Sequence, residues 1–381
     1  MRHENIVFHR VLKHLPFDEL ERLVAAHGAD DRERGFNTKS HLVTLLYAQL
    51  SGTTGLRAIA DGLKSCSNRL YHLGVTAPSK STFAEANRQR ERGEVFGEFL
   101  GLMLKRAGRA ARRALDGATY LIDATAVTLN ARSADWARFS ATACGAKLHV
   151  VYDPDADRPI YSAITAGNVN DITAAKAMPI VPGATYAFDL GYYDYTWWAE
   201  LDQQSCRLVT RLKRNTRLER AEERSVPRDG NIVGVRIGFL PARQARNRKN
   251  PFQKPVREIE VRLDTGKHIR IVTNDLEAPA EEIAEIYKRR WAIELFFRWV
   301  KQTLQITKFL GTSQTAVRAQ IAVALIAYLL LRLAQATQSA ITSPLAFARL
   351  VRIHLMQRRD LANLLGPPPA RHKDPNQLVL V

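Results

Sequence analysis

One stretch of the chain places a carboxylate, two cations and a phenol where they could act on a single substrate. The four side chains are Tyr287, Arg290, Glu294 and Lys301. If the stretch is a helix, the other three side chains fall within about 40° of Glu294 around its axis. One face of this helix would therefore present a carboxylate flanked by positive charge.

The rest of the same stretch is apolar. Residues 286, 293, 297, 300 and 304 form an apolar stripe about a quarter-turn from the charged face, and Trp291, Leu295 and Trp299 lie on the other flank. This pattern predicts a mostly buried helix. A buried helix with one charged face is a candidate for chemistry rather than for solubility alone.

Two further acids, Asp123 and Asp189, each come directly after a short apolar run typical of a strand. Two such acids on adjacent strands, with Glu294 from a neighbouring helix, could bind two divalent cations, and hard oxygen ligands suit magnesium. Two ions about 4 Å apart would activate an attacking oxygen and stabilise a leaving one in phosphodiester chemistry. Arg290 and Lys301 could hold phosphates or keep Glu294 ionised.

Each acid also has a simpler interpretation when it is considered alone. Asp123 could cap the turn that follows it, and Asp189 could be a turn residue. Glu294 could form a structural ion pair with Arg290 or Arg298 at helical spacing. A single architecture that explains all three acids together favours the metal site.

The helix residues match, at all four positions, the Tyr-two-Arg-three-Glu-six-Lys signature of bacterial cut-and-paste transposases. The stretch resembles the insertion-sequence-four group of the DDE transposases. Asp123, in Leu-Ile-Asp-Ala-Thr, resembles the first acid of that family, and Asp189, in Phe-Asp-Leu-Gly-Tyr-Tyr, resembles the second. Gly167-Asn-Val-Asn-Asp171 is similar to a family element with a mainly structural role. The resemblance covers about residues 120–325.

The resemblance implies a set of site residues and a cofactor. The catalytic, metal-binding acids would be Asp123, Asp189 and Glu294. The side chains that contact terminal DNA phosphates would be Tyr287, Arg290 and Lys301. Each active site would hold two Mg²⁺ ions, and Mn²⁺ would substitute for them.

The resemblance also implies a reaction and its partners. Hydrolysis at the transposon end would free a 3′-hydroxyl, which in related members first attacks the opposite strand to give a hairpin. Strand transfer into target DNA would complete the cycle. The partners would be double-stranded DNA, as terminal inverted repeats and as target, and a second copy of the chain in a DNA-bound homodimer.

The implied fold is α/β, with a ribonuclease H-like core of mixed sheet flanked by helices. The residue patterns predict an all-helical N-terminal segment and a β-rich insert, with strands near 232–239, 256–263 and 268–273. The predicted divisions are a helical domain that could bind DNA (1–112), the first part of the core (113–216), the insert (217–270), the second part of the core with the glutamate helix (271–340) and a C-terminal tail (341–381).

Two features of the N-terminal segment leave its role open. A pair of short helical pieces near residues 56–73 has the size of a helix-turn-helix, but an ordinary helical hairpin explains it equally well. The basic residues between 88 and 113 could line a DNA backbone or form a solvated helix face.

The composition is that of a globular protein with a strong positive charge. Among 381 residues the net charge is +18, which favours a polyanionic partner, nucleic acid before membrane, although a generally basic surface is the alternative. Three scattered cysteines form neither a disulfide framework nor a zinc spacing. The N-terminus lacks an apolar signal core, and the longest apolar run, 321–331, is too short to cross a bilayer. We therefore expect a cytoplasmic bacterial protein that joins the nucleoid when it is bound to DNA.

Two alternatives to a transposase stay open. A non-catalytic DNA-binding protein derived from such an enzyme would keep the basic surface and lose an acid, and here all three acids are present. A metal-dependent DNA nuclease of the same fold would cut without joining, and the residues alone do not distinguish it from a transposase.

Overall fold

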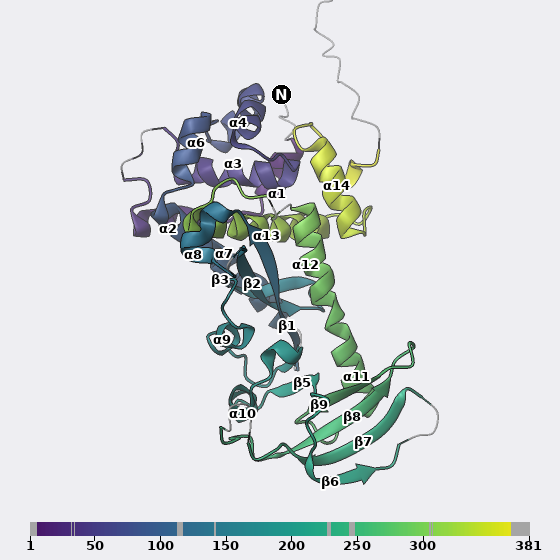
Figure 1. Ribbon diagram of the computed structural model, residues 1–381. Helices are drawn as coiled ribbons and strands as arrows, with labels where there is room; N and C mark the ends of the chain where they lie inside the picture. The colour runs from purple at the N-terminus through teal and green to yellow at the C-terminus, as the bar shows by residue number, and fades with distance from the viewer. Residues whose placement is uncertain are drawn as a thin grey trace, which may run out of the picture. The chain divides into compact units, whose positions relative to one another are not determined.

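The computed structural model describes residues 6–366, except 32, 34, 113–116, 141, 227–229, 244–247, 305 and 307. The chain divides into two compact units (Figure 1). The first unit contains Met1–Leu100 together with Trp299–Val381, and the second contains Gly101–Arg298. The early and late parts of the chain therefore fold together, while the middle forms a unit of its own.

In the part of the chain that the structure describes, the second unit is built on one nine-stranded sheet. Its strands are β1 (Thr119–Leu129), β2 (Cys144–Asp153), β3 (Arg158–Ala166), β4 (Thr185–Phe188), β5 (Arg207–Arg211), β6 (Glu219–Arg224), β7 (Ile232–Phe239), β8 (Pro255–Arg262) and β9 (His268–Thr273). Across the sheet the order is β3-β2-β1-β4-β5-β9-β8-β7-β6. Strand β4 runs parallel to β1 and β5, and the other neighbours are antiparallel. This mixed sheet confirms the predicted α/β class with a ribonuclease H-like core.

Short and long helices accompany the sheet. They are η2 (Ala131–Ser133), α8 (Ala134–Ala137), α9 (Asp171–Lys176), η3 (Leu190–Tyr192), α10 (Tyr195–Gln203), α11 (Ala280–Arg289) and α12 (Trp291–Thr303). Helix α10 packs on β5, and α11 contacts β4, β5, β7, β8 and β9. The helix that was expected at 287–301 thus consists of the end of α11 and most of α12.

The central strand β4 is buried along its whole length, as expected for a parallel strand covered on both faces. Its last residue, Phe188, packs its ring 5.0 Å from that of Trp197, and Trp198 is equally buried. Asp194 caps α10 by accepting a hydrogen bond from Trp197 N at 3.0 Å. The aromatic core therefore fixes the end of β4, and Asp189 is the residue that follows it.

The strands predicted for the β-rich insert are confirmed as β7, β8 and β9. Strand β6 was not predicted, because its sequence Glu-Arg-Ala-Glu-Glu-Arg is exposed throughout and has no apolar alternation. Pairing with β7 alone accounts for it. Since β9 pairs with both β5 and β8, the predicted insert continues the core sheet.

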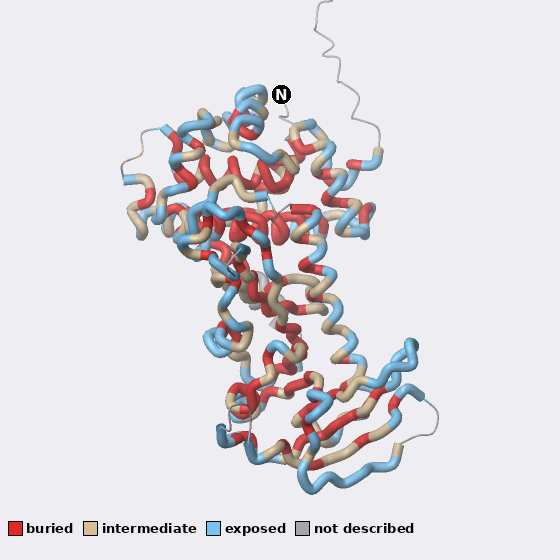
Figure 2. The backbone as a smooth tube through the Cα atoms, viewed as in Figure 1, coloured by how far each residue is buried: buried red, intermediate tan, exposed pale blue. Residues whose placement is uncertain are grey.

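The first unit is helical in its described part. Its helices are α1 (Val7–Leu12), α2 (Phe17–His27), α3 (Thr38–Ser51), α4 (Leu56–Ser65), α5 (Ser67–Leu70), η1 (Tyr71–Leu73), α6 (Lys80–Ala86), the first part of α7 (Arg90–Arg112), α13 (Gln314–Ala336), α14 (Pro344–His354) and η5 (Leu361–Asn363). Helix α13 contacts α1, α3 and α14, and most of it is buried (Figure 2). It is the one described helix long and apolar enough to cross a membrane, but 83% of its most apolar window is buried inside the protein.

Two expectations about the C-terminal third differ from the structure. Helix α13 was predicted to belong to the catalytic core, but it packs within the first unit. The apolar sequence of this helix predicts that it is buried, but it does not show which elements bury it. The segment from 341 was expected to be a tail, yet it contains α14, whose Phe347 and Val351 are buried. The backbone nitrogen of Phe8 donates to the Leu355 carbonyl oxygen at 2.8 Å, which joins the two ends of the described chain. Residues 367–381 of the expected tail lie outside the described residues.

Candidate active site

The register between β1 and β4 brings two acids together. The parallel pairing runs from Thr119 opposite Thr185 to Ile122 opposite Phe188, and the next residue on each strand is an aspartate. Because parallel strands advance together, Asp123 and Asp189 lie side by side where the pairing ends. The expectation that Asp123 ends its strand was wrong, since β1 continues to residue 129 against β2.

Backbone amides orient both carboxylates. Asp123 Oδ1 accepts a hydrogen bond from Ala124 N at 2.8 Å, and Asp189 Oδ1 accepts one from Gly191 N at 2.8 Å. Each acid thus keeps its second oxygen free of these amide bonds. The point at which the β1–β4 pairing ends therefore carries a pair of pre-oriented carboxylates.

Glu294 is linked to one of these two acids, Asp123, through an arginine. The Arg290 guanidinium places Nη2 2.8 Å from Glu294 Oε1 and Nη1 3.6 Å from Asp123 Oδ2. The same guanidinium lies 5.8 Å from the centre of the Tyr287 ring. The structure therefore gathers Asp123, Asp189, Arg290, Glu294 and Tyr287 at one site of the second unit.

A change of helical pitch sets this geometry. Arg290 N donates to the Tyr287 carbonyl oxygen at 3.1 Å, and Ile293 N donates to the Arg290 carbonyl oxygen at 3.3 Å. These bonds span three residues rather than four, so the helix tightens between α11 and α12. Nearby, Phe296 packs 5.0 Å from the Tyr152 ring of β2, which fixes α12 against the sheet.

The electrostatics of the site are those of crowded, partly buried carboxylates. Burial above all, and then the charges of Asp189 and Glu294, raise the pKa of Asp123 to about 6, against the opposing effects of the Ala124 amide and Arg290. Burial also raises the pKa of the Tyr287 phenol. A site that resists carrying its own negative charge is one that a cation would stabilise.

Carboxylate oxygens are suitable ligands for a hard divalent cation. Asp123 and Asp189 are adjacent, and backbone amides orient them. Burial and neighbouring carboxylates raise the pKa of Asp123, so a bound cation would stabilise its ionised form. Within the described residues, however, no group of three His, Cys, Asp or Glu side chains is arranged to hold a metal ion. Glu294 is instead paired with Arg290. The two strand-end acids fit a metal, and Glu294 would have to leave Arg290 to share it.

The remaining residue of the four-residue signature, Lys301, is placed differently. It lies about two turns beyond Glu294 on α12 and belongs to the first unit. Burial lowers the pKa of its ammonium group.

The apolar flank of the glutamate helix was expected to be buried, and for two residues this was wrong. Trp291 is 52% exposed and Leu295 is 47% exposed. They are four residues apart and so form one exposed apolar strip on α12. Periodicity identified the strip, but it does not show whether another element covers it.

Tyr192 was not predicted as a residue of the site, but its hydroxyl is buried close to the acids. Its signal was its position three residues after Asp189, in a turn where an aromatic ring points back into the core. Asp171 was noted only as part of a structural element. It also lies beside the Asp189 turn.

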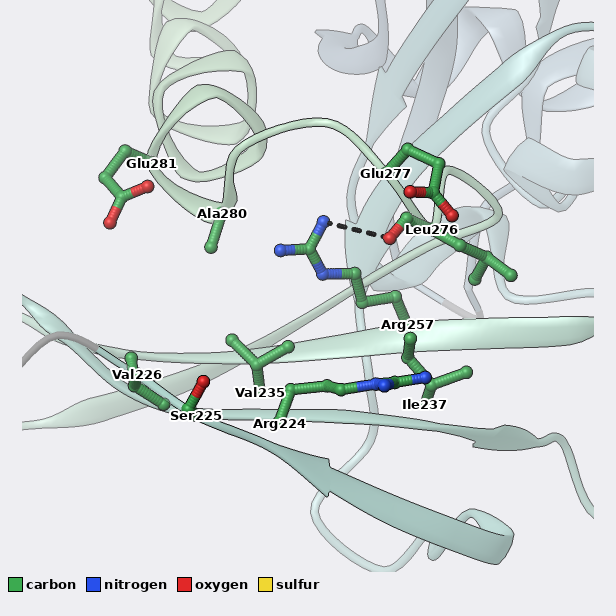
Figure 3. A pocket seen from close by; sticks show the side chains of 10 residues that line it. All are labelled: Arg224, Ser225, Val226, Val235, Ile237, Arg257, Leu276, Glu277, Ala280 and Glu281. Atoms are coloured by element: carbon green, nitrogen blue, oxygen red, sulfur yellow. Dashed lines mark hydrogen bonds between the residues drawn. The ribbon is translucent and has the colours of Figure 1, made fainter.

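A cavity of the second unit lies away from these acids. A cavity of about 430 Å³ lies between β6–β8 and the start of α11, and none of the three acids lines it (Figure 3). Its Arg257 donates hydrogen bonds to the carbonyl oxygens of Leu276 and Ala278 and so supports the start of α11. Cavity size alone therefore does not identify the reactive site.

The chain is similar to known transposases over a region that contains Asp123, Asp189 and Glu294. A family model described as a transposase DDE domain matches residues 116–330, and a model described as a domain of unknown function matches residues 3–76. A protein of Sinorhizobium fredii named as transposase y4zB is 40% identical over 303 residues, which cover 78% of this chain and 84% of that protein. A protein of Geobacillus stearothermophilus named as a transposase for insertion sequence element IS5377 is 29% identical over 343 residues, covering 88% of this chain and 86% of that protein. The piggyBac transposase, solved in a synaptic complex with hairpin DNA, gives a TM-score of 0.48 at 10% identity over 97% of this chain and 84% of that chain.

Proposed function

Because this chain belongs to the DDE transposases, a family of metal-dependent enzymes that cut and join DNA, we propose that Asp123, Asp189 and Glu294 are its catalytic acids. The observation that carries the proposal is the register of β1 and β4, which sets the two aspartates side by side. Glu294 is linked to Asp123 through Arg290. A metal site accounts for all three acids at once, whereas separate capping and ion-pair roles would not explain why the three acids lie together.

The proposed cofactor is a pair of Mg²⁺ ions, with Mn²⁺ as a substitute, held by the three acids. Bound metal would supply the Lewis acid that activates the attacking oxygen and stabilises the leaving one. The amides of Ala124 and Gly191 would hold the aspartates in place. Arg290, once released from Glu294, would turn its fixed fork of donors to a phosphate.

The proposed substrate is double-stranded DNA carrying the terminal inverted repeats of an insertion sequence. Tyr287, Arg290 and Lys301 would contact phosphates of the cut end. Hydrolysis would release a 3′-hydroxyl, which would attack the opposite strand to form a hairpin and, after the hairpin opens, a phosphate of the target DNA. Two ends must be cut together, so the DNA-bound form would be a homodimer.

The division of labour along the chain is part of the same proposal. Residues 1–112 would bind DNA outside the active site, and the β-rich region 217–270 would act as an insert of the catalytic core. The net charge of +18 supports a polyanionic partner for the chain as a whole, and a DNA-bound enzyme would lie at the nucleoid.

The test is a cleavage and joining assay with DNA that carries the element's own ends, a target plasmid and Mg²⁺. Asp123→Asn, Asp189→Asn and Glu294→Gln should each lower end cleavage by at least about 100-fold, because each removes a metal ligand. Glu260→Gln, which changes an acid of β8 away from the site, is the matched control and should cleave normally.

The products distinguish the proposal from its alternatives. Cleavage followed by joining supports a transposase, cleavage without joining indicates a nuclease, and binding without cleavage indicates a DNA-binding protein. If the three variants cut as well as the unaltered protein, the assignment of the acids is wrong.

The proposed separation of metal binding from DNA binding has its own test. Lys301→Ala should weaken binding of end DNA and leave the Mn²⁺ affinity unchanged, because its ammonium group is assigned to a phosphate. Loss of Mn²⁺ affinity with DNA binding intact would contradict that assignment.

A further inference from the structure

A second carboxylate stands behind the turn that carries Asp189. A Cβ atom placed on Gly191 would lie 3.0 Å from Asp189 Oδ1 and 3.3 Å from Asp171 Oδ2. The two carboxylates therefore approach the same point from two elements, the end of β4 and the start of α9. A side chain at position 191 would make tight contacts with both oxygens and would displace them by a few tenths of an ångström.

Strand β2 holds Asp171 in this position. Lys147 Nζ lies 2.9 Å from Asp171 Oδ1 and 2.9 Å from the Val169 carbonyl oxygen. His149 Nδ1 lies 4.0 Å from the same Oδ1, and it is a buried nitrogen without a hydrogen-bond partner among the described residues. Oδ1 of Asp171 is thus held by Lys147, while Oδ2 borders the Asp189 turn.

The side chain of Tyr192, three residues after Asp189, brings a buried hydroxyl close to this group of acids. Tyr192 is 1% exposed, and in the described part of the chain its hydroxyl has no hydrogen-bond partner. Burial first, and then Asp123, Asp171 and Asp189, raise the pKa of this phenol, so it stays protonated and can only donate or accept as a neutral group. A buried donor without an acceptor is costly, and the nearby acids are its natural acceptors.

We propose that Asp171 and Tyr192 are positioning residues for Asp189, an inference that rests on the proposed role of Asp189 as a metal ligand. Asp171, held by Lys147 on the other side of Gly191, limits the space open to the Asp189 carboxylate and so restricts its orientation. The Tyr192 hydroxyl, which has no partner among the described residues of the metal-free protein, would donate to one of these carboxylates when the metal is bound. Groups that orient a metal-binding carboxylate typically change metal affinity 10–100-fold when they are replaced.

The test measures Mn²⁺ binding to the full chain by calorimetry in the absence of DNA. Asp171→Asn and Tyr192→Phe, which keep the shapes of their side chains, should each weaken Mn²⁺ binding by about tenfold or more. Their thermal midpoints in EDTA should stay near that of the unaltered protein. Tyr161→Phe, which removes a hydroxyl from β3, is the matched control and should bind Mn²⁺ normally.

A double-substitution cycle decides whether Asp171 acts through Asp189. In the Asp189→Asn background, Asp171→Asn should cause no further loss of Mn²⁺ affinity. An equal loss in both backgrounds would make Asp171 a metal ligand in its own right and overturn the inference, as would normal Mn²⁺ binding by Asp171→Asn. Normal Mn²⁺ binding by Asp189→Asn would instead refute the proposed metal site on which the inference rests.

Discussion

Replacing Asp123 by asparagine should stabilise the metal-free protein at neutral and alkaline pH. The Asp123 side chain is 17% exposed, and its pKa rises from an ordinary 3.8 to about 6 on folding. Burial is the largest cause, and the neighbouring charges of Asp189 and Glu294 add to it. The fold therefore bears a cost whenever this carboxylate is ionised, and the neutral amide of asparagine removes that cost.

The size and sign of the effect follow from proton linkage. Because the pKa is higher in the folded state, the folded protein binds the extra proton, and the stability it contributes is complete below about pH 4 and lost as the pH rises through 6. A shift of about two units corresponds to about 3 kcal/mol at 1.36 kcal/mol per unit. The Asp123→Asn variant should therefore be more stable than the unaltered protein by the full amount at pH 8 and by about half of it at pH 5. In a domain of this size its thermal midpoint should be higher by roughly 5–10 °C at pH 8.

Thermal unfolding in EDTA between pH 5 and pH 8.5 measures this difference directly. Asp135→Asn, which neutralises an exposed acid of α8, is the matched control and should show no pH-dependent gain. Adding Mg²⁺ should reverse the order, because only the unaltered protein gains stability from binding the ion. If Asp123→Asn is no more stable than the unaltered protein in EDTA at pH 8, or if its advantage is the same at every pH, the carboxylate does not carry the predicted cost.

Three further substitutions test other contacts. Arg290→Gln should lower the thermal midpoint in EDTA more than in Mn²⁺, because metal can replace the guanidinium that pairs with Glu294; equal losses in both media would contradict this. Trp291→Ala should lower the free energy of unfolding by about half of the 3–5 kcal/mol typical of a fully buried aromatic side chain, because this side chain is half exposed; a loss as large as that of a buried tryptophan in chemical denaturation would contradict this. Arg92→Met should cost about 2 kcal/mol in chemical denaturation, since this 1%-exposed guanidinium donates to the Phe36 carbonyl oxygen at 2.8 Å.

The acids of the candidate site could be selected from the sequence because each of them carries a local signal. Asp189 follows an apolar strand and precedes a glycine turn, and the helix residues repeat at helical spacing around Glu294. These signals depend only on near neighbours in the chain. The α/β class and strands β7 to β9 were predictable for the same reason, since alternation and turn residues are local patterns.

The features that the sequence did not predict depend on distant partners. Strand β1 continues past Asp123 because β2 pairs with it, and the buried Val127 and Leu129 belong to that pairing. The exposure of Trp291 depends on the absence of a covering element within its own unit, and the burial of α14 depends on helices at the other end of the chain. Periodicity marks an apolar face, but only the folded chain shows what lies against it.

Core packing also explains why Asp123 and Asp189 lie side by side where the pairing of β1 with β4 ends. Their neighbours in the chain, Ile122 and Phe188, are buried on the sheet, so the register of β1 against β4 is fixed by core packing. Since side chains alternate along a strand, a slip of one residue would move Asp123 to the opposite face and separate it from Asp189. Carboxylates that repel one another cannot select this arrangement themselves. The aromatic core imposes the register, and the partly buried, crowded carboxylates that result are the feature on which the proposed metal site rests.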